Sequence, residues 1–420
     1  MSSRAEVKLV ASASLFVLLI WGLLYLNHET GGRLWRLAAL AGGLWAGYGL
    51  KRRCWPDADP LILPVIHALN LLGLALLYRL EPSLADRQIL WVLVGLAGLA
   101  VIGLIPDYRF LLEYKYTGAV LTLALLAATL AVGVEAGGAR SWLAVGVLRM
   151  QPVEAAKLLM VIFLAGYLEE NRELLRANWR PWGSIALPAP QALVPLATIW
   201  GLSLLLVAFQ RDLGGSLILF CTLVAMLYQA TERRLYLAAG GLLLLLGFGT
   251  GYVLFDHVQS RIRAWLDPWS QAYGTGYQLV QGWFALAAGG LLGSGVGVGY
   301  PHLVPAVTTD YLFAALAEEM GLLGGLGLLA LYLVLTWRGF RTALRAQDSA
   351  GCLLAGGLSS LLALQTLILL GGVTGMLPLT GVALPYFSYG GSSMVVSYLL
   401  AGLLLQVGQR GPSGRGGRNS

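Results

Sequence analysis

Hydrophobic runs long enough to cross a membrane dominate this sequence. A span needs about 20 apolar residues, and twelve candidate runs lie near residues 9–26, 34–50, 61–80, 89–105, 116–134, 152–168, 193–209, 213–230, 235–254, 311–336, 353–374 and 383–408. Charged residues make up only 12% of the chain, roughly half of their share in a soluble domain. The sequence therefore predicts an all-α, polytopic membrane protein.

The distribution of Lys and Arg predicts how the chain is oriented. If the N-terminus lies inside, most of the 28 basic residues fall on the side that holds both termini, as the positive-inside rule requires. The net charge of +7 then belongs to cytoplasmic loops, and no nucleic-acid partner is expected. The run at 9–26 lacks a small-residue cleavage site before a polar domain, so we expect a retained helix. The tail at 411–420, rich in Gly, Arg and Ser, is expected to be disordered.

A long loop at 255–310 interrupts the hydrophobic runs, and the predicted orientation places it outside. Loops of this length are uncommon unless they bind or react with something. Arg261 and Arg263 suit a phosphate group, because a planar guanidinium can donate to it in a bidentate manner. An amphipathic stretch begins at residues 274–278 and includes Trp283 and Phe284, and we expect it to lie in the membrane interface. The Gly-dense run 289–299 lets backbone approach a ligand closely. The loop is therefore the predicted location of the chemistry.

An ionisable pair follows the loop that contains Arg140. Pro152 suits a first helical position, and Glu154 and Lys157 then lie three residues apart on one helical face, where they can pair. Charges this close to hydrocarbon are costly and indicate function by default. The alternative is an interfacial pair that only anchors the helix, and it stays open.

Carboxylates stand next to three predicted helix starts. Asp212 and Asp267 occupy positions typical of N-caps, and Pro268 follows at an expected first helical position. Capping is the simpler role for Asp212, with ligand contact as the alternative. Asp310 precedes the next span, and the pair Glu318–Glu319 lies about two turns into it, where carboxylates need a polar cavity.

The segment 378–393 places two prolines and a Gly-Gly pair where a helix should begin. Irregular backbone at membrane depth is tolerated only where it lines a cavity or is buried in protein. The pattern favours such a break, with a kinked helix as the alternative.

Six of these stretches together resemble the SEDS (shape, elongation, division and sporulation) family of RodA, FtsW and SpoVE. The matching runs are GARSWL, QPVEAAK, RDLGGS, GTGYQLVQGWFALAAGGLLGSGVG, TTDYLFAALAEEMGLLG and LPLTGVALPYFSYGGSS, in the family's order. The resemblance implies ten helices, both ends cytoplasmic, and a large extracellular loop between the seventh and eighth. Ten predicted spans lie from residue 61 onward, and the long loop follows the seventh. We therefore expect an N-terminal extension with two helices at 1–58, the membrane core at 59–410 and the tail at 411–420.

The resemblance implies a peptidoglycan glycosyltransferase that polymerises lipid II outside the bacterial cytoplasmic membrane and works with a class B penicillin-binding protein. The family's motif positions fall on Arg140, Glu154, Lys157, Asp212, Gln278, Asp310, Glu318 and Ser388. The expected roles are a carboxylate of the long loop as general base, with Arg140, Arg261 and Lys157 on the lipid diphosphate. A divalent cation, Mg²⁺ or Mn²⁺, is a candidate to share that charge, although no metal-ligand spacing specifies one.

One position departs from the family's pattern. Gln271 stands where the family usually has its catalytic Asp, and Val153 stands where Ser is common. An amide can donate a hydrogen bond but cannot take a proton from a hydroxyl. Three accounts stay open: Asp267 is the base, another outer carboxylate such as Asp310 is, or the protein is a scaffold or regulator of a cell-wall synthase. A flippase of the lipid-linked precursor, which needs a cavity but no base, is the remaining alternative.

Overall fold

The computed structural model describes residues 34–136, 138–146, 148–176, 179–182, 185–187 and 189–409, with Ala11 and Leu15 as isolated positions. The chain forms two compact units. Unit 1 comprises the described residues within 1–104, 259–339 and 365–420, and unit 2 comprises those within 105–258 and 340–364. Apart from the two isolated positions, the predicted span at 9–26 lies outside the described residues, as does the tail at 411–420.

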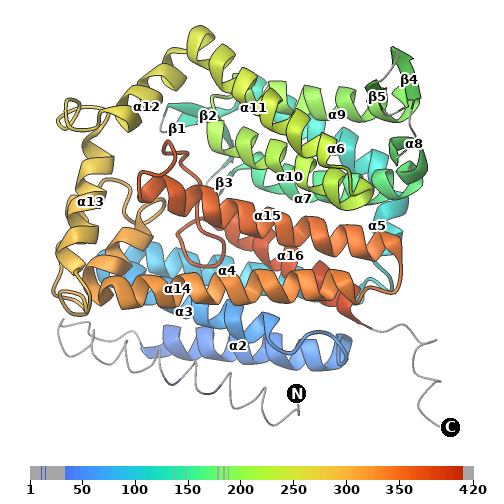
Figure 1. Cartoon of the computed structure of the whole chain (residues 1–420). Coiled ribbons are helices and arrows are strands. Elements are labelled where there is room, and N and C mark those ends of the chain that lie inside the picture. The colour runs from blue at the N-terminus through green and yellow to red at the C-terminus, as the bar shows by residue number, and fades with distance from the viewer. Residues whose placement is uncertain are drawn as a thin grey trace. The chain divides into compact units, whose positions relative to one another are not determined.

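Unit 1 is mainly helical. Its helices are α2 (Leu34–Cys54), α3 (Ile62–Leu80), α4 (Pro82–Leu104), α13 (Tyr277–Gly289), the 3₁₀ helix η1 (Pro301–Leu303) and α16 (Gly391–Gly408), with most of α12 (Asp256–Leu266), most of α14 (Leu312–Leu344) and the end of α15 (Ser349–Val373). In Figure 1, α3, α4 and α14 run in nearly the same direction, and α13 lies across them near one end. A helix set across the spans in this way fits the amphipathic stretch that the sequence predicts to lie in the membrane interface.

Unit 2 combines helices with two small antiparallel sheets. The helices are α5 (Arg109–Glu113), α6 (Lys115–Val132), α7 (Pro152–Glu170), α8 (Arg172–Arg176), α9 (Pro190–Phe209), α10 (Leu213–Thr231) and α11 (Arg234–Leu254), with the remaining parts of α12, α14 and α15. One sheet has the order β1 (Val134–Ala136), β2 (Ala139–Val145), β3 (Leu148–Met150), and the other pairs β4 (Trp179–Trp182) with β5 (Ile185–Leu187). The sequence did not predict these strands, because such short runs between long apolar helices carry little periodicity.

The prediction of a polytopic helical membrane protein is confirmed. Among the described residues, nine helices are long and apolar enough to cross a membrane: α3, α4, α6, α9, α10, α11, α14, α15 and α16. The predicted spans at 34–50 and 152–168 also form helices, α2 and α7, and each of these contains four charged residues.

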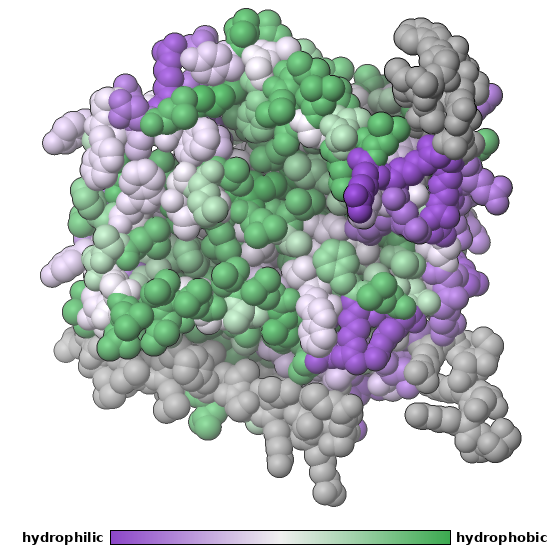
Figure 2. All heavy atoms as spheres, in the orientation of Figure 1, coloured by the Kyte–Doolittle hydropathy of each residue, from purple (hydrophilic) through white to green (hydrophobic). Residues whose placement is uncertain are grey.

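Apolar side chains cover much of the face shown in Figure 2. On α11, the side chains of Leu242, Leu243, Leu245 and Leu246 are each more than half exposed. A soluble protein rarely exposes a continuous apolar surface of this kind. The surface is expected where lipid tails surround the helix, and it agrees with a multi-pass membrane protein.

Two glycines bring α2 close to α4 within unit 1. A Cβ atom added at Gly43 would lie 2.8 Å from the Leu93 side chain, and one added at Gly47 would lie 2.8 Å from the Leu96 side chain. Small residues four apart let two helix backbones approach closely, which is a common way for helices to associate in lipid. The second helix of the predicted N-terminal extension is therefore packed as part of unit 1.

The loop predicted at 255–310 is largely structured, since it contains α12, α13 and η1. Helix α13 covers most of the amphipathic stretch that begins at Gly274, and the position of that stretch in the membrane interface stays a prediction. The predicted helix start at Asp267 and Pro268 is wrong, because α12 ends just before them and a run of turns follows. Gly274 and Gly276 disfavour a helix through this stretch. Asp267 caps a turn instead: its Oδ1 accepts the Ser270 N–H at 3.2 Å.

The predicted break near 378–393 is confirmed, and the alternative of a kinked helix is excluded. The backbone from Thr374 to Gly390 is not helical, and α16 begins at Gly391 rather than near residue 383. Tyr386, next to Pro385, adopts a φ of 66°, which is uncommon for a residue with a side chain.

Polar side chains from neighbouring helices bond to this irregular backbone. Gln88 of α4 bridges it: its Nε2 donates to the Ser388 carbonyl at 3.0 Å, and its Oε1 accepts the Gly390 N–H at 3.2 Å. Tyr332 of α14 donates to the Pro385 carbonyl at 2.6 Å. Because lipid offers no hydrogen-bond partners, these side chains bond to backbone groups that water would satisfy in a soluble loop.

The close approach of α3 to the broken segment can be tested. A Cβ atom at Gly73 would lie 2.1 Å from the Phe387 carbonyl oxygen, which belongs to the backbone and cannot rotate away. We expect Gly73→Ala to lower the free energy of unfolding by about 1–3 kcal/mol, as overpacking does, measured by unfolding in detergent. Gly118→Ala is the control, because its Cβ would meet only Leu159, at 3.8 Å. Equal losses in the two variants would contradict this account.

Candidate functional site

A Gly-rich part of the long loop is joined to a break in α14. The helix contains one residue with non-helical geometry, Gly321, with φ 67° and ψ −168°. In an unbroken helix the N–H groups of Leu322 and Leu323 would donate four residues back, to the carbonyls of Glu318 and Glu319. They donate instead to the carbonyls of residues 290 and 291, at 2.9 and 3.3 Å.

The two carbonyls released by this break accept bonds from the same loop. The Ser294 N–H donates to the Glu318 carbonyl at 2.9 Å, and the Gly295 N–H donates to the Glu319 carbonyl at 3.1 Å. Two helical bonds are thus replaced by four bonds between loop and helix. We call this arrangement, formed by residues 290–300 and 318–323, the α14 splice.

Three glycines allow the loop and the helix to approach this closely. An added Cβ would lie 2.0 Å from the Ala317 carbonyl oxygen at Gly289, 2.1 Å from that of Glu319 at Gly293, and 2.4 Å from the Gly293 nitrogen at Gly321. The expected close approach of the Gly-dense backbone therefore occurs against α14 itself. Its approach to a ligand stays a prediction.

The predicted acidic pair Glu318–Glu319 is buried within the splice, with 6% and 1% of the residues exposed. Glu318 Oε1 accepts the Tyr300 N–H at 2.6 Å, and Glu319 Oε2 accepts the Gly297 N–H at 3.0 Å. The polar surroundings that carboxylates need at this depth are therefore supplied by loop N–H groups. A role of Glu318 in substrate binding stays a prediction.

Arg79, at the end of α3, completes this cluster and was not among the predicted site residues. Its Nε lies 2.6 Å from Glu319 Oε1, and its Nη2 donates to the Gly299 carbonyl at 2.7 Å. The Nε–H is not aligned with the carboxylate oxygen, so that contact is an ion pair rather than a hydrogen bond. The sequence offered one weak signal, a single charge near the end of an apolar run, which snorkelling explains equally well.

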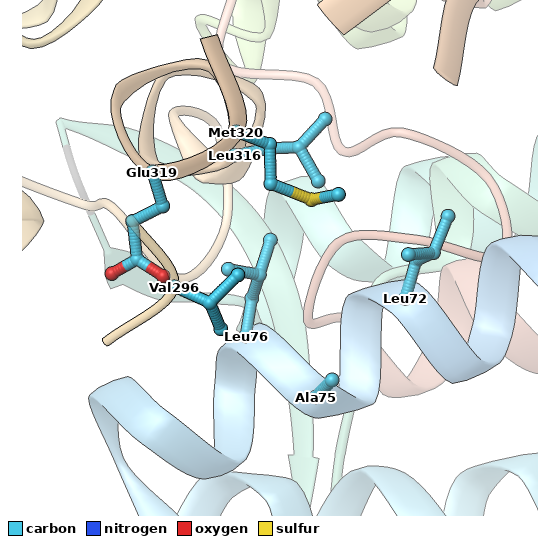
Figure 3. Close-up of a pocket in the computed structure, with 7 residues that line it drawn as sticks. All are labelled: Leu72, Ala75, Leu76, Val296, Leu316, Glu319 and Met320. Atoms are coloured by element: carbon cyan, nitrogen blue, oxygen red, sulfur yellow. The ribbon is translucent and has the colours of Figure 1, made fainter. Parts of the chain in front are cut away.

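A small cavity borders the splice (Figure 3). It is lined by Leu72, Ala75, Leu76, Val296, Leu316, Glu319 and Met320, and Glu319 is the single ionisable residue among these. Its volume is about 10 Å³, which is room for one water molecule at most. The cavity is therefore too small to hold a sugar or a lipid.

Gln278 and Asp310 belong to segments that touch the break before α16. Gln278 Nε2 donates to the Pro305 carbonyl at 3.1 Å. The Tyr389 N–H, next to Ser388, donates to the Thr308 carbonyl at 3.0 Å. The stretch that ends at Asp310 is thus fixed to α13 on one side and to the break on the other.

Two further contacts connect the same region. Arg261 of α12 donates from Nη1 to the Leu379 carbonyl at 3.1 Å. A Cβ atom at Gly381 would lie 3.6 Å from Asp310 Oδ2, so the Asp310 carboxylate lies beside the broken segment. Unit 1 therefore collects these predicted site residues on contacting segments: Arg261, Gln278, Asp310 and Ser388.

Asp267 and Gln271 lie on the exposed turn between α12 and α13. The Gln271 carbonyl accepts the N–H groups of Gly274 and Gly276, at 2.9 and 3.0 Å, and so closes the turn. A carboxylate or an amide exposed here is open to a ligand. The choice between Asp267 and another base stays a prediction.

In unit 2 the predicted Glu154–Lys157 pair is formed and buried. Lys157 Nζ lies 2.9 Å from Glu154 Oε2, and the two side chains are 2% and 8% exposed. A snorkelling anchor would place the ammonium group in water. The pair therefore does not snorkel, and the choice between an anchor of the helix and a group that recognises a charged ligand stays a prediction.

Arg140 and Asp212 both bond to backbone groups in unit 2. Arg140 Nε donates to the Gly133 carbonyl at 3.0 Å, and Nη1 donates to the Leu130 carbonyl at 3.2 Å, at the end of α6. Asp212 Oδ1 accepts the Gly215 N–H at 2.8 Å, which confirms Asp212 as the N-cap of α10. Contact of either residue with a ligand stays a prediction.

Within the described ranges, no group of three or more His, Cys, Asp or Glu side chains is arranged to hold a metal ion. Mg²⁺ at phosphate-transfer sites is commonly held by one or two carboxylates together with the substrate phosphates. A cation beside Asp310 would therefore fit only if the diphosphate supplied most of its ligands.

Comparison with protein-family models decides what the chain is related to. Residues 61–411 match the model for FtsW, RodA and SpoVE, described as cell cycle protein. The chain belongs to the FtsW/RodA/SpoVE family. This is the SEDS family that the six sequence stretches indicated.

Family members from several bacteria are similar along most of their length. The chain is 41% identical to the peptidoglycan glycosyltransferase RodA of Mycobacterium tuberculosis (strain H37Rv), over 85% of this chain and 79% of that protein. It is 36% identical to the protein of the same name from Mycobacterium leprae, over 96% and 90%. It is 35% identical to the stage V sporulation protein E of Bacillus subtilis, over 83% and 97%.

Solved structures of the family share this fold. A chain from a peptidoglycan synthase complex that coordinates polymerization and crosslinking superposes with a TM-score of 0.70 at 29% identity, over 84% of this chain and 98% of that one. The crystal structure of the rod shape determining protein RodA of Thermus thermophilus superposes with a TM-score of 0.62 at 27% identity, over 84% and 97%. Helix α2 precedes the region that matches the family model.

The buried pair in unit 2 gives a stability test. Glu154→Leu leaves the Lys157 ammonium in a buried place without its carboxylate, so we expect the free energy of unfolding to fall by about 3–5 kcal/mol. Adding Lys157→Met should recover most of this loss, because both charges are then gone. Unfolding in detergent measures both variants. A single variant as stable as the unchanged protein would show that the pair is not the interaction that holds α7.

Proposed function

We propose that the chain is a peptidoglycan glycosyltransferase that polymerises lipid II at the outer face of the bacterial cytoplasmic membrane, with both termini in the cytoplasm. The observation that carries the proposal is the 41% identity, over 85% of the chain, to a protein named peptidoglycan glycosyltransferase RodA. A membrane-embedded fold with nine candidate spans among the described residues suits a lipid-borne substrate. The positive-inside bias of Lys and Arg supports the orientation.

The proposed reaction joins the anomeric carbon of one lipid-linked disaccharide to the 4-hydroxyl of another. The bond between the anomeric carbon and the diphosphate breaks, and undecaprenyl diphosphate leaves with the bonding electrons. The proton of the attacking hydroxyl passes to a general base. The site therefore needs a carboxylate beside the hydroxyl and positive charge beside the diphosphate.

Asp310 is our first candidate for the base. It is half-buried, and the stretch that leads to it is bonded to α13 and to the broken segment. A base held by packed segments is better preorganised than one on an exposed turn. Asp267 is the second candidate, because it lies closer along the chain to Gln271, where the family usually has its catalytic Asp.

The cations proposed for the diphosphate, from the family's motif positions and the long loop, are Arg140, Lys157 and Arg261. A guanidinium has five N–H donors, so the carbonyl contacts of Arg140 and Arg261 leave capacity for a phosphate. Glu154, Asp212, Gln278, Glu318 and Ser388 are proposed as further residues that bind or orient the substrate. A divalent cation carried with the diphosphate would neutralise the remaining negative charge.

The proposed partner is a class B penicillin-binding protein that cross-links the new glycan. Its support is the similarity to a chain from a synthase complex in which polymerization and crosslinking are coordinated. The names of the matching family, cell cycle protein, and of one relative, stage V sporulation protein E, support a role in cell-wall growth, division or sporulation. Gln271 favours one second candidate function, a scaffold that regulates a synthase without transferring sugars.

Labelled lipid II, supplied to the purified chain in liposomes with and without its partner, tests the proposed function. We expect glycan chains, and we expect Asp310→Asn to slow their formation by about 10²–10⁴-fold, because the amide cannot accept the proton. Asp267→Asn is the matched variant, with the same change on the exposed turn. If only the Asp267→Asn variant stops forming glycan chains, Asp267 rather than Asp310 is the base.

Two other outcomes would point to the alternatives. If no glycan forms under any condition and Gln271→Asp restores it, the chain is a scaffold that has lost its base. If fluorescent lipid II moves between leaflets without being joined, the chain is a flippase.

A further inference from the structure

We propose that Arg79 and Glu319 are positioning residues for the transfer reaction. The pair holds the α14 splice and, through it, the segment that carries Asp310. The inference rests on the proposed function, and it adds two residues that need not touch the substrate.

Each member of the pair bonds to one side of the same three-residue stretch. Glu319 Oε2 accepts the Gly297 N–H at 3.0 Å, and Arg79 Nη2 donates to the Gly299 carbonyl at 2.7 Å. The ion pair between the two side chains, 2.6 Å from Nε to Oε1, fixes the two bonds relative to each other. Removing either side chain would delete one loop bond and leave the other charge buried.

The splice is the first of several anchors on the way to Asp310. Glu318 Oε1 accepts the Tyr300 N–H at 2.6 Å, where the chain leaves the splice. The carbonyls of Pro305 and Thr308 accept the bonds from Gln278 and Tyr389 described above. Asp310 then donates its own N–H to the Ala306 carbonyl at 3.1 Å. A shift at the splice therefore changes the starting point of the segment that places the carboxylate.

Because the pair is buried among apolar side chains, a variant can be designed that removes the bonds to the loop and keeps the fold. The side chains of Arg79 and Glu319 are 9% and 0% exposed, and the adjoining cavity is lined mainly by Leu, Ala, Val and Met side chains. Replacing a buried ion pair by apolar residues of similar volume is often neutral or stabilising. The same replacement would delete both bonds to the loop. An apolar pair should therefore keep the fold and lose the placement of the loop.

The test is the double variant Arg79→Met/Glu319→Leu, compared with a second ion pair in the same unit. The control is Arg338→Met/Asp59→Leu, which removes a partly buried pair 3.2 Å apart. Arg338 lies on α14 as well, further along the helix than Glu319. Lipid II polymerisation gives kcat and KM for each protein, unfolding in detergent gives the melting temperature, and amide hydrogen exchange reports on residues 290–300.

We expect the Arg79→Met/Glu319→Leu protein to stay folded, with a melting temperature lowered only by the two loop groups that lose their partners, and to show a similar KM for lipid II. Its kcat should fall by about 10²-fold, the size of loss that a misplaced catalytic group produces, and hydrogen exchange over 290–300 should be faster. The control pair should change neither kcat nor that exchange.

Three results would overturn the inference: an unchanged kcat in the folded double variant, an equal loss of kcat in the control, or a loss of kcat that only follows a lower melting temperature. If the unchanged protein makes no glycan, the proposed function fails by itself. Hydrogen exchange then decides whether the pair holds the loop, and unchanged exchange in the double variant overturns the inference in that case too.

Discussion

This structure depends on one constraint, which is that backbone groups inside the bilayer cannot form hydrogen bonds with water. In hydrocarbon every N–H and C=O group must find a partner within the protein. The chain breaks its helices at two places in unit 1 and meets this constraint differently at each. At Gly321 the released groups of α14 bond to a Gly-rich loop. Between α15 and α16 the irregular backbone bonds to side chains of Gln88 and Tyr332. Both breaks place backbone N–H and C=O groups among apolar helices, where they can contact a polar ligand inside the membrane.

The ionisable residues follow the same logic. Charges at this depth are paired with each other or with backbone groups, as in the Glu154–Lys157 pair of unit 2 and the Arg79–Glu319 pair of unit 1. The residues proposed for the reaction fall into a set in each unit. In unit 1 these are Arg261, Gln278, Asp310, Glu318 and Ser388, with Asp267 on the exposed turn, and in unit 2 they are Arg140, Glu154, Lys157 and Asp212. Polymerisation of a lipid-linked sugar asks for both kinds of group, a base for the hydroxyl and positive charge for the diphosphate.

Local patterns in the sequence predicted the features that local physics decides. Apolar length predicted the spans, the spacing of Glu154 and Lys157 predicted their pair, and the position of Asp212 before an apolar run predicted its cap. The failures have one cause in common. Arg79 bonds to a carbonyl 220 residues away, and Gln88 to one 300 residues away, so neither role leaves a mark near the residue itself. The helix start predicted at Asp267 failed for a different reason. Asp-Pro is typical of a helix start and also of a turn, and the glycines that follow favour the turn.

Helix α2 lies against α4 through a seam of two glycines. It precedes residues 61–411, which match the family model, but it lies within the 96% of the chain that is similar to RodA of Mycobacterium leprae. When such a helix packs against the protein, contacts with lipid are replaced by contacts with α4. The hydrogen bonds and ion pairs described above do not involve it. A lineage can therefore gain or lose it by small steps, since each intermediate still presents an apolar surface to the bilayer. The helix can accordingly be present in some members of the family while the pattern common to the family begins after it.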